Sequence, residues 1–381
     1  MTMSKKIWIF LIVAIIFSIA FFVFPEFFST SVAYKQGEQT INTIKTELIK
    51  KIVPIVPPLN KELYDQKLLE LANNPPPKQP TTKIVNVKNK DGTITESTVV
   101  VPPPPEKPNI WPVKTEYPKD GALLPFNRII AYYGNLYSTK MGVLGEYPET
   151  EMLAKLAVEV KKWETADPNT PVIPALHYIA VVAQASAGGD GKYRTRMPFT
   201  EIDKVLTIAE KINAIVFLDI QVGFSTVEAE VPLLEKYLKM PNVHLGIDPE
   251  FSMKTGIRPG KVVGTLDATD INFATEYLAK LVKDNNLTPK ILIIHRYTQK
   301  MVTNYQNITT PPEVQFIMHM DGWGGQAKKI GTYTHFIYPE PVQFTGFKLF
   351  YKNDILTAGT TLMTPETLLK LNPRPIYIQY Q

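Results

Sequence analysis

Two carboxyl side chains, Asp248 and Glu250, follow directly after a short apolar stretch that is typical of a buried strand, Val243–Ile247. Because successive side chains of a strand point to opposite faces, these two residues share one direction if the extended geometry persists. Each carboxyl group raises the pKa of the other, so the pair can supply a proton donor for catalysis. Parallel α/β barrels keep their catalytic groups at this end of their strands.

Other predicted strands end in polar side chains in the same manner. The set comprises His177 from strand two, Asp219 and Gln221 from strand three, His295 and Arg296 from strand five, His319 and Asp321 from strand six, and Glu340 from strand seven. Each of these residues taken singly can have a structural role, such as Asp248 forming a turn before Pro249. As a group they predict a functional pocket, because burying such side chains is costly unless they are paired.

The elements that would position these residues lie between residues 111 and 381. Apolar runs alternate there with amphipathic segments, which predicts a (β/α)8 TIM-like barrel. The predicted strands cover residues 129–133, 172–182, 214–220, 243–247, 291–294, 314–318, 335–338 and 376–380. Residues 346–351 are an alternative for strand seven. An open doubly wound sheet is less favoured, because the first strand is not followed by a glycine fingerprint.

The preceding residues predict an attachment to a membrane. An apolar run at residues 7–24 follows Lys5 and Lys6, so residues 1–33 are expected to be a signal anchor that leaves the C-terminal domain extracytoplasmic. Cleavage after Ala33 would instead give a secreted protein. Residues 34–74 have helical periodicity and predict a helical stalk. Residues 75–110 are rich in proline, contain a hairpin pattern, and predict a spacer that holds the barrel away from the membrane.

Composition excludes several functions. The net charge of +5 is not gathered into a basic patch, so no nucleic-acid partner is expected. The chain has no cysteine, which rules out disulfides, thiolate metal sites and a cysteine nucleophile. We expect no cofactor.

The motifs resemble barrel-type glycoside hydrolases. Asp248-x-Glu250 is similar to the end of the chitinase-like family 18 motif DxxDxDxE, and Met318-His319-Met320-Asp321 is similar to that family's MxYD. The resemblance implies that Glu250 is the catalytic acid, that Asp248 positions an acetamido group of the substrate, and that Asp321 supports it. Val243, Gly246 and Met320 depart from the motif residues.

A second resemblance is to the clan of retaining barrels that have an acid on strand four and a glutamate nucleophile on strand seven. Glu250 and Glu340 match those places if strand seven covers residues 335–338. Pro249 stands where the clan has an asparagine. Both resemblances agree on Glu250 and differ on its partner.

Three functions remain open on these residues. The first is hydrolysis of a cell-envelope or extracellular polysaccharide, for which Tyr133 and Trp323 offer aromatic faces to sugar rings. The second is a non-catalytic barrel that binds a glycan or a protein. The third is a metal-dependent hydrolase that uses the histidines and aspartates. We assign no metal, because the chain has no HExxH motif and no His-x-His pair on strand one.

Overall fold

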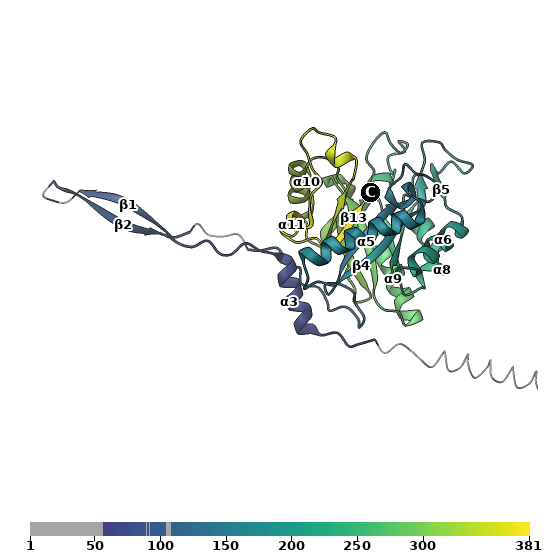
Figure 1. Cartoon of the computed structure of the whole chain (residues 1–381), viewed down its shortest axis with the longest axis horizontal. Coiled ribbons are helices and arrows are strands. Elements are labelled where there is room, and N and C mark those ends of the chain that lie inside the picture. The colour runs from purple at the N-terminus through teal and green to yellow at the C-terminus, as the bar shows by residue number, and fades with distance from the viewer. Residues whose placement is uncertain (1–55, 89, 91, 104–107) are drawn as a thin grey trace, which may run out of the picture. The chain divides into compact units, whose positions relative to one another are not determined.

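Eight parallel strands close into a barrel in the computed structural model, which describes residues 56–88, 90, 92–103 and 108–381 (Figure 1). The strands follow one another around the barrel in chain order, and the last pairs with the first. They are β3 (Arg128–Gly134), β4 (Val172–Ala183), β6 (Ile215–Ile220), β7 (Val243–Ile247), β9 (Lys290–Arg296), β11 (Val314–Met320), β12 (Phe344–Leu349) and β13 (Tyr377–Tyr380). The predicted (β/α)8 architecture is therefore confirmed.

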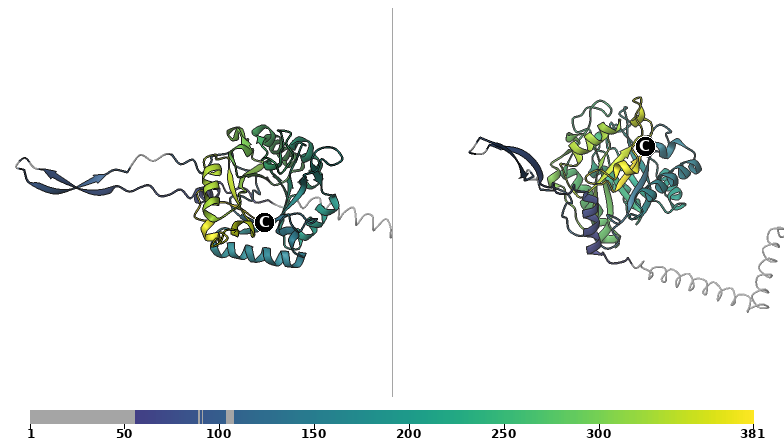
Figure 2. Two further views of the ribbon diagram at one scale, coloured as in Figure 1. Left: turned by 90° about the horizontal axis from the view of Figure 1, so that it is seen from above. Right: turned by 60° about the vertical axis from the view of Figure 1, so that its left-hand side comes forward.

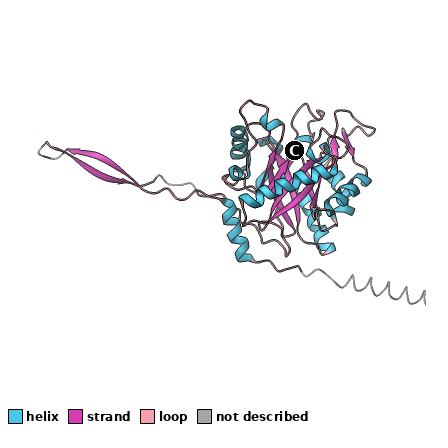
Figure 3. Ribbon diagram, viewed as in Figure 1, coloured by secondary structure: helices cyan, strands magenta, loops and turns pink. Residues whose placement is uncertain are grey.

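Helices surround the strands on the outside of the barrel (Figures 2 and 3). They are α4 (Val143–Glu146), α5 (Glu149–Ala166), α6 (Phe199–Glu210), α7 (Val227–Glu230), α8 (Glu235–Leu238), α9 (Ala268–Asn285), α10 (Gln326–Thr332) and α11 (Pro365–Leu368). The predicted alternation is interrupted once, between β9 and β11. Short turns fill that connection, together with β10 (Val302–Thr303), which pairs with β8 (Leu266–Asp267). A further short strand, β5 (Arg194–Arg196), pairs with β4.

Alternation of side chains within each strand separates the interior of the barrel from the helical layer. In β9, Ile291 and Ile293 pack inside the barrel, whereas Leu292 and Ile294 pack against the helices. Both sets are fully buried, which explains why the strands read as continuous apolar runs in the sequence. The polar residues that end the strands follow the same alternation, so each one faces either the interior or the helices.

The prediction of strand seven at residues 335–338 is wrong, and the alternative near residues 346–351 is close to the observed strand. Residues Tyr333–Ile337 form a π-helical turn that continues α10. Tyr333 and Ile337 are buried four residues apart, which is the spacing of a helix face rather than of a strand. Strand seven is β12, which pairs with β11 and β13.

A helix that precedes the barrel in sequence closes its N-terminal end. Helix α3 (Lys61–Ala72) begins after Asn60, whose side chain accepts a hydrogen bond from the Leu63 N–H. Tyr64 of this helix packs into the cluster at the starts of the strands, with Leu124 and Ile129 among its members. The aromatic rings of Tyr117 and Phe126 contact Tyr64 edge-on, with ring centroids 5.7 and 6.1 Å away.

We expect Tyr64→Ala to lower the free energy of unfolding by about 3–5 kcal/mol, because it removes a large buried ring and leaves a cavity. Tyr64 is 2% exposed, whereas Leu69 on the same helix is 65% exposed. Urea denaturation of the two alanine variants measures the difference. Leu69→Ala should be nearly neutral, and an equally small effect of Tyr64→Ala would show that α3 does not contribute to the core.

The proline-rich segment contains the predicted hairpin, formed by β1 (Thr81–Lys88) and β2 (Ile94–Val101) in antiparallel register. Because α3 lies upstream of this segment and already packs on the barrel, the segment does not separate the barrel from the residues before α3. It is an insertion whose two ends lie close together, because the Asn74 side-chain amide donates a 2.7 Å hydrogen bond to the Trp111 carbonyl oxygen.

The predicted signal anchor at residues 1–33, and the part of the predicted stalk before residue 56, lie outside the described residues. Within the described ranges, no helix combines the length and the apolar character that crossing a membrane requires.

Candidate active site

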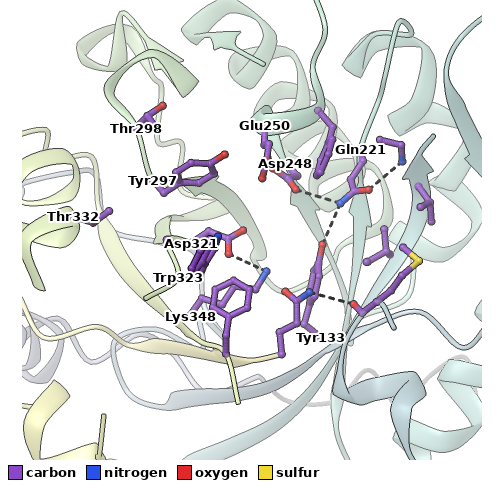
Figure 4. A pocket seen from close by; sticks show the side chains of 18 of the residues that line it. Tyr133, Gln221, Asp248, Glu250, Tyr297, Thr298, Asp321, Trp323, Thr332 and Lys348 are labelled. Atoms are coloured by element: carbon purple, nitrogen blue, oxygen red, sulfur yellow. Dashed lines mark hydrogen bonds and ion pairs between the residues drawn. The ribbon is translucent and has the colours of Figure 1, made fainter. Parts of the chain in front are cut away.

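A pocket of about 670 Å³ opens at the C-terminal ends of the barrel strands (Figure 4). Its polar lining includes Tyr133, Gln221, Asp248, Glu250, Asp321 and Lys348, and its aromatic lining includes Phe251, Tyr297, Trp323, Phe336 and Phe350. The polar side chains come from five different strands or from the turns directly after them. The pocket therefore lies where barrels of this fold place their chemistry.

The two carboxylates after strand four are held by a short turn. Strand β7 ends at Ile247, and Asp248 caps the 3-10 turn Pro249–Phe251 by accepting a 3.0 Å hydrogen bond from the Glu250 N–H. The Gln221 side chain lies 3.3 Å from the second Asp248 oxygen. The strand geometry does not continue through these residues as the parity argument assumed, yet both side chains reach the same pocket.

Both carboxyl groups have a raised pKa. Burial, together with the negative charge of Asp321, raises the pKa of Glu250 above its usual range. Burial also holds the pKa of Asp248 well above its usual range, and the negative charges of Glu250 and Asp321 add to this effect. The Tyr297 hydroxyl hydrogen bonds to Glu250 and opposes the shift there.

Asp321 favours the opposite state. One of its oxygens lies 3.0 Å from the Lys348 ammonium, and the other lies 2.7 Å from Nδ1 of His295. Burial alone would raise the pKa of Asp321, but the charges of Lys348 and His295 outweigh it and hold this pKa well below its usual range. The pocket thus combines one carboxyl group whose pKa is lowered with two whose pKa values are raised.

A second layer of polar side chains lies beneath the pocket floor. His177, Asp219, His295 and His319 are fully buried and do not line the pocket. Tyr133 connects the two layers, because its hydroxyl donates a 2.9 Å hydrogen bond to Oδ2 of Asp219.

The histidines of this layer differ in charge. Burial alone would lower the pKa of His295, but the nearby carboxylates of Asp219 and Asp321 outweigh it and raise this pKa to about 10. Burial lowers the pKa of His177 to about 4 despite its contact with Asp219, and it holds the pKa of His319 well below its usual range.

The structure brings together most of the residues that the sequence singled out, at two depths. Glu250, Asp248, Asp321, Gln221, Tyr133 and Trp323 line the pocket, whereas His177, Asp219, His295 and His319 lie below it. Trp323 stands at the rim and is 51% exposed.

Arg296 and Glu340 are not part of this pocket. Arg296 follows the outward alternation of β9, and its guanidinium lies 2.5 Å from a Glu340 oxygen. Glu340 lies in the connection between the π-helical turn and β12, so it does not occupy the end of strand seven. The structure gives it a structural ion pair in place of the nucleophile position that the retaining-clan resemblance implied.

Lys348 and Tyr297 are pocket residues that sequence reasoning missed. Lys348 lies near the end of the true strand seven, with its ammonium 3.9 Å from the centre of the Tyr133 ring. The signal available in the sequence was a lysine within the apolar run Phe344–Leu349, where a solvated side chain would be out of place. Tyr297 directly follows β9 and was passed over beside His295 and Arg296.

The fold and the pocket define a (β/α)8 barrel protein with a carboxyl-lined site at the C-terminal ends of its strands. No protein-family model and no curated protein matches the chain. Solved structures resemble it at low identity. A cellulase shares 12% identity over 67% of this chain and 75% of its own, with a TM-score of 0.36. A Bacillus subtilis mannanase is 12% identical in sequence over 68% of this chain and 81% of its own, with a TM-score of 0.34. A Burkholderia cenocepacia dihydropteroate synthase is 8% identical in sequence over 68% of this chain and 86% of its own, with a TM-score of 0.32.

Proposed function

We propose that this barrel hydrolyses O-glycosidic bonds of a cell-envelope or extracellular polysaccharide. The observation that carries the proposal is the opposite shift of carboxyl pKa values within one pocket, raised at Glu250 and lowered at Asp321. Glycoside hydrolysis needs this combination, because one carboxyl group must donate a proton and another must be negative at the same pH.

Each carboxyl group has a separate role in the proposed reaction. Glu250 gives its proton to the leaving oxygen as the bond to the anomeric carbon breaks. The Asp321 carboxylate stabilises the positive charge that develops on the sugar. A water molecule then adds to the anomeric carbon and returns a proton to Glu250, which restores the acid. Asp248 is a positioning residue, because it holds the backbone of Glu250.

The pocket residue that strand seven contributes bears on whether the reaction uses a covalent intermediate. Among the described pocket residues it contributes Lys348, and the predicted nucleophile Glu340 lies elsewhere. We therefore propose no covalent intermediate on strand seven, and we keep from the two resemblances the role on which they agree, that of Glu250 as the acid. The aromatic residues Tyr297, Phe251 and Trp323 around the carboxyl groups offer faces on which sugar rings can stack.

The place of action follows from the N-terminal residues. The apolar run at residues 7–24, preceded by Lys5 and Lys6, supports the proposal that the barrel is exported and stays attached to the membrane. A polymer of the envelope or of the surroundings is then the substrate within reach.

The second candidate is a barrel that binds a glycan without cleaving it. Lys348 favours this function, because its ion pair with Asp321 partly neutralises the carboxylate that would stabilise the transition state.

One experiment separates the two functions. Purified protein is incubated with peptidoglycan, chitin-type and plant or microbial polysaccharides, and both released reducing sugars and bound protein are measured. Release from one polymer supports hydrolysis and identifies the substrate class. Retention on a polymer without release would replace the enzyme by a binding module.

A further inference from the structure

Three fully buried side chains under the pocket floor direct one atom each toward a common point. They are His177 of β4, Asp219 of β6 and His295 of β9. Oδ1 of Asp219 lies 3.3 Å from Nε2 of His177 and 3.5 Å from Nε2 of His295, and all three atoms lie within 4.8 Å of one another. These separations exceed the about 2.7–2.9 Å of a charge-assisted hydrogen bond. None of the three atoms has a hydrogen-bond partner among the described residues.

The outer nitrogen of each histidine, by contrast, is held firmly. Nδ1 of His295 lies 2.7 Å from Oδ2 of Asp321, and Nδ1 of His177 lies 2.6 Å from the Tyr377 hydroxyl. Histidines that bind metals almost always donate their other ring N–H to such a carboxylate or oxygen, which fixes the ring and leaves Nε2 with its lone pair.

Asp219 follows the same arrangement. Its Oδ2 accepts the 2.9 Å hydrogen bond from the Tyr133 hydroxyl, which leaves Oδ1 directed at the histidines. The neighbouring strand provides the room, because Gly246 of β7 faces the cluster. A Cβ atom at Gly246 would lie 2.5 Å from both Asp219 Oδ1 and His177 Nε2. Any larger residue would therefore displace the two atoms.

The spacing fits a metal centre. Nitrogen and oxygen ligands lie about 2.0–2.1 Å from zinc, so neighbouring ligand atoms of a tetrahedral site are about 3.3 Å apart. Two imidazoles and one carboxylate suit zinc and its first-row neighbours, whereas magnesium and calcium prefer oxygen ligands alone.

We propose that His177, Asp219 and His295 bind one divalent transition-metal cation, such as Zn²⁺, beneath the pocket floor. The sequence showed no metal motif because the ligands come from three strands and lie 42 or more residues apart in the chain. The proposal does not depend on glycoside hydrolysis. A metal bound there would affect the pocket through Tyr133 and Asp321, which contact the ligand residues and also line the pocket.

A charged network without a metal is the competing explanation. His295 in its protonated form would then lie between Asp219 and Asp321, and His177 would contact Asp219 without a cation. Metal binding separates the two explanations directly, because a purely ionic cluster has no affinity for Zn²⁺ or Co²⁺.

The experiment uses the full chain, purified in detergent and freed of metal by dialysis against EDTA. Titration with Co²⁺ is followed by its visible absorption, and zinc content is measured by elemental analysis after reloading. We expect one equivalent per chain, and at least about 100-fold weaker binding in His177→Gln and in His295→Gln. His244→Gln is the matched control, since His244 is equally buried but accepts a hydrogen bond from the Ile291 N–H and lies outside the cluster. This control should bind as the wild type does.

Circular dichroism checks that each variant is folded. Should the histidine variants fail to fold, Tyr377→Phe removes the nearer of the two groups that contact Nδ1 of His177, the other being the Gln379 side-chain amide 3.0 Å away. This variant should weaken binding about tenfold. A folded wild-type chain that takes up neither metal at millimolar concentration would overturn the proposal. Wild-type affinity in both folded histidine variants would overturn it too, because the metal would then bind elsewhere.

Discussion

Glu250→Gln is expected to lower the turnover of a glycan substrate by about 10²–10⁴-fold while leaving substrate binding and folding nearly unchanged. Glutamine has almost the same shape as the protonated glutamic acid but cannot give a proton to the leaving oxygen, and positioned acids contribute about this factor. Because burial disfavours the charged form of Glu250 and raises its pKa, removing the charge does not remove a stabilising ion. Initial rates of sugar release and thermal unfolding measure the two effects.

The raised pKa of Glu250 also predicts the direction in which activity changes with pH. The protonated form is the active one, so activity should persist below the raised pKa of Glu250 and decline as the pH rises through it. The decline should therefore begin above the ordinary glutamate pKa of about 4.3. Glu228→Gln, on the surface helix α7, is the control and should keep both the rate and the pH profile. Unchanged turnover in Glu250→Gln would remove Glu250 from the mechanism, and a large loss of stability would make it a structural residue.

Lys348→Met is expected to lower the free energy of unfolding by about 3–5 kcal/mol. The ion pair between Lys348 and Asp321 is buried, and removing one partner leaves the other charge inside the protein without full compensation. The pKa of Asp321 should rise, since the Lys348 charge is a main cause of its low value. Chemical denaturation measures the stability, and hydrolysis should weaken as well because less of the carboxylate stays ionised.

A neighbouring lysine provides the control for this prediction. Lys352 also forms an ion pair, with Glu146, but its side chain is 71% exposed. Lys352→Met should leave stability almost unchanged, because exposed pairs are screened by water. If the two methionine variants behaved alike, the Lys348 ion pair would contribute no more than a surface contact.

The strands of the barrel could be predicted because their signal is local. Runs such as Ile291–Ile294 are apolar throughout, and burial on both faces favours that composition. The error at strand seven arose because Tyr333 and Ile337 belong to an apolar aromatic run that suits a strand by composition. Only their spacing of four residues marks the helical turn.

The depth of the site residues could not be read from the sequence in the same way. Asp248 follows β7 and lines the pocket, whereas Asp219 lies within β6, in register with Gly246 of β7, and is beneath the pocket. Depth depends on this register between neighbouring strands. Lys348 was missed for a different reason. A lysine is normally solvated, and its burial here depends on Asp321, which lies 27 residues earlier on the adjacent strand.

The hydrogen bond between Asn74 and Trp111 has a consequence for how the protein can vary between relatives. This hydrogen bond holds residues 74 and 111 close together, whatever the length of chain that joins them. The entropy of closing such a loop grows only with the logarithm of its length, so lengthening or exchanging the hairpin costs the barrel little. The length of the segment at residues 75–110 and the side chains on its surface can therefore change during evolution, while the geometry of the pocket stays the same.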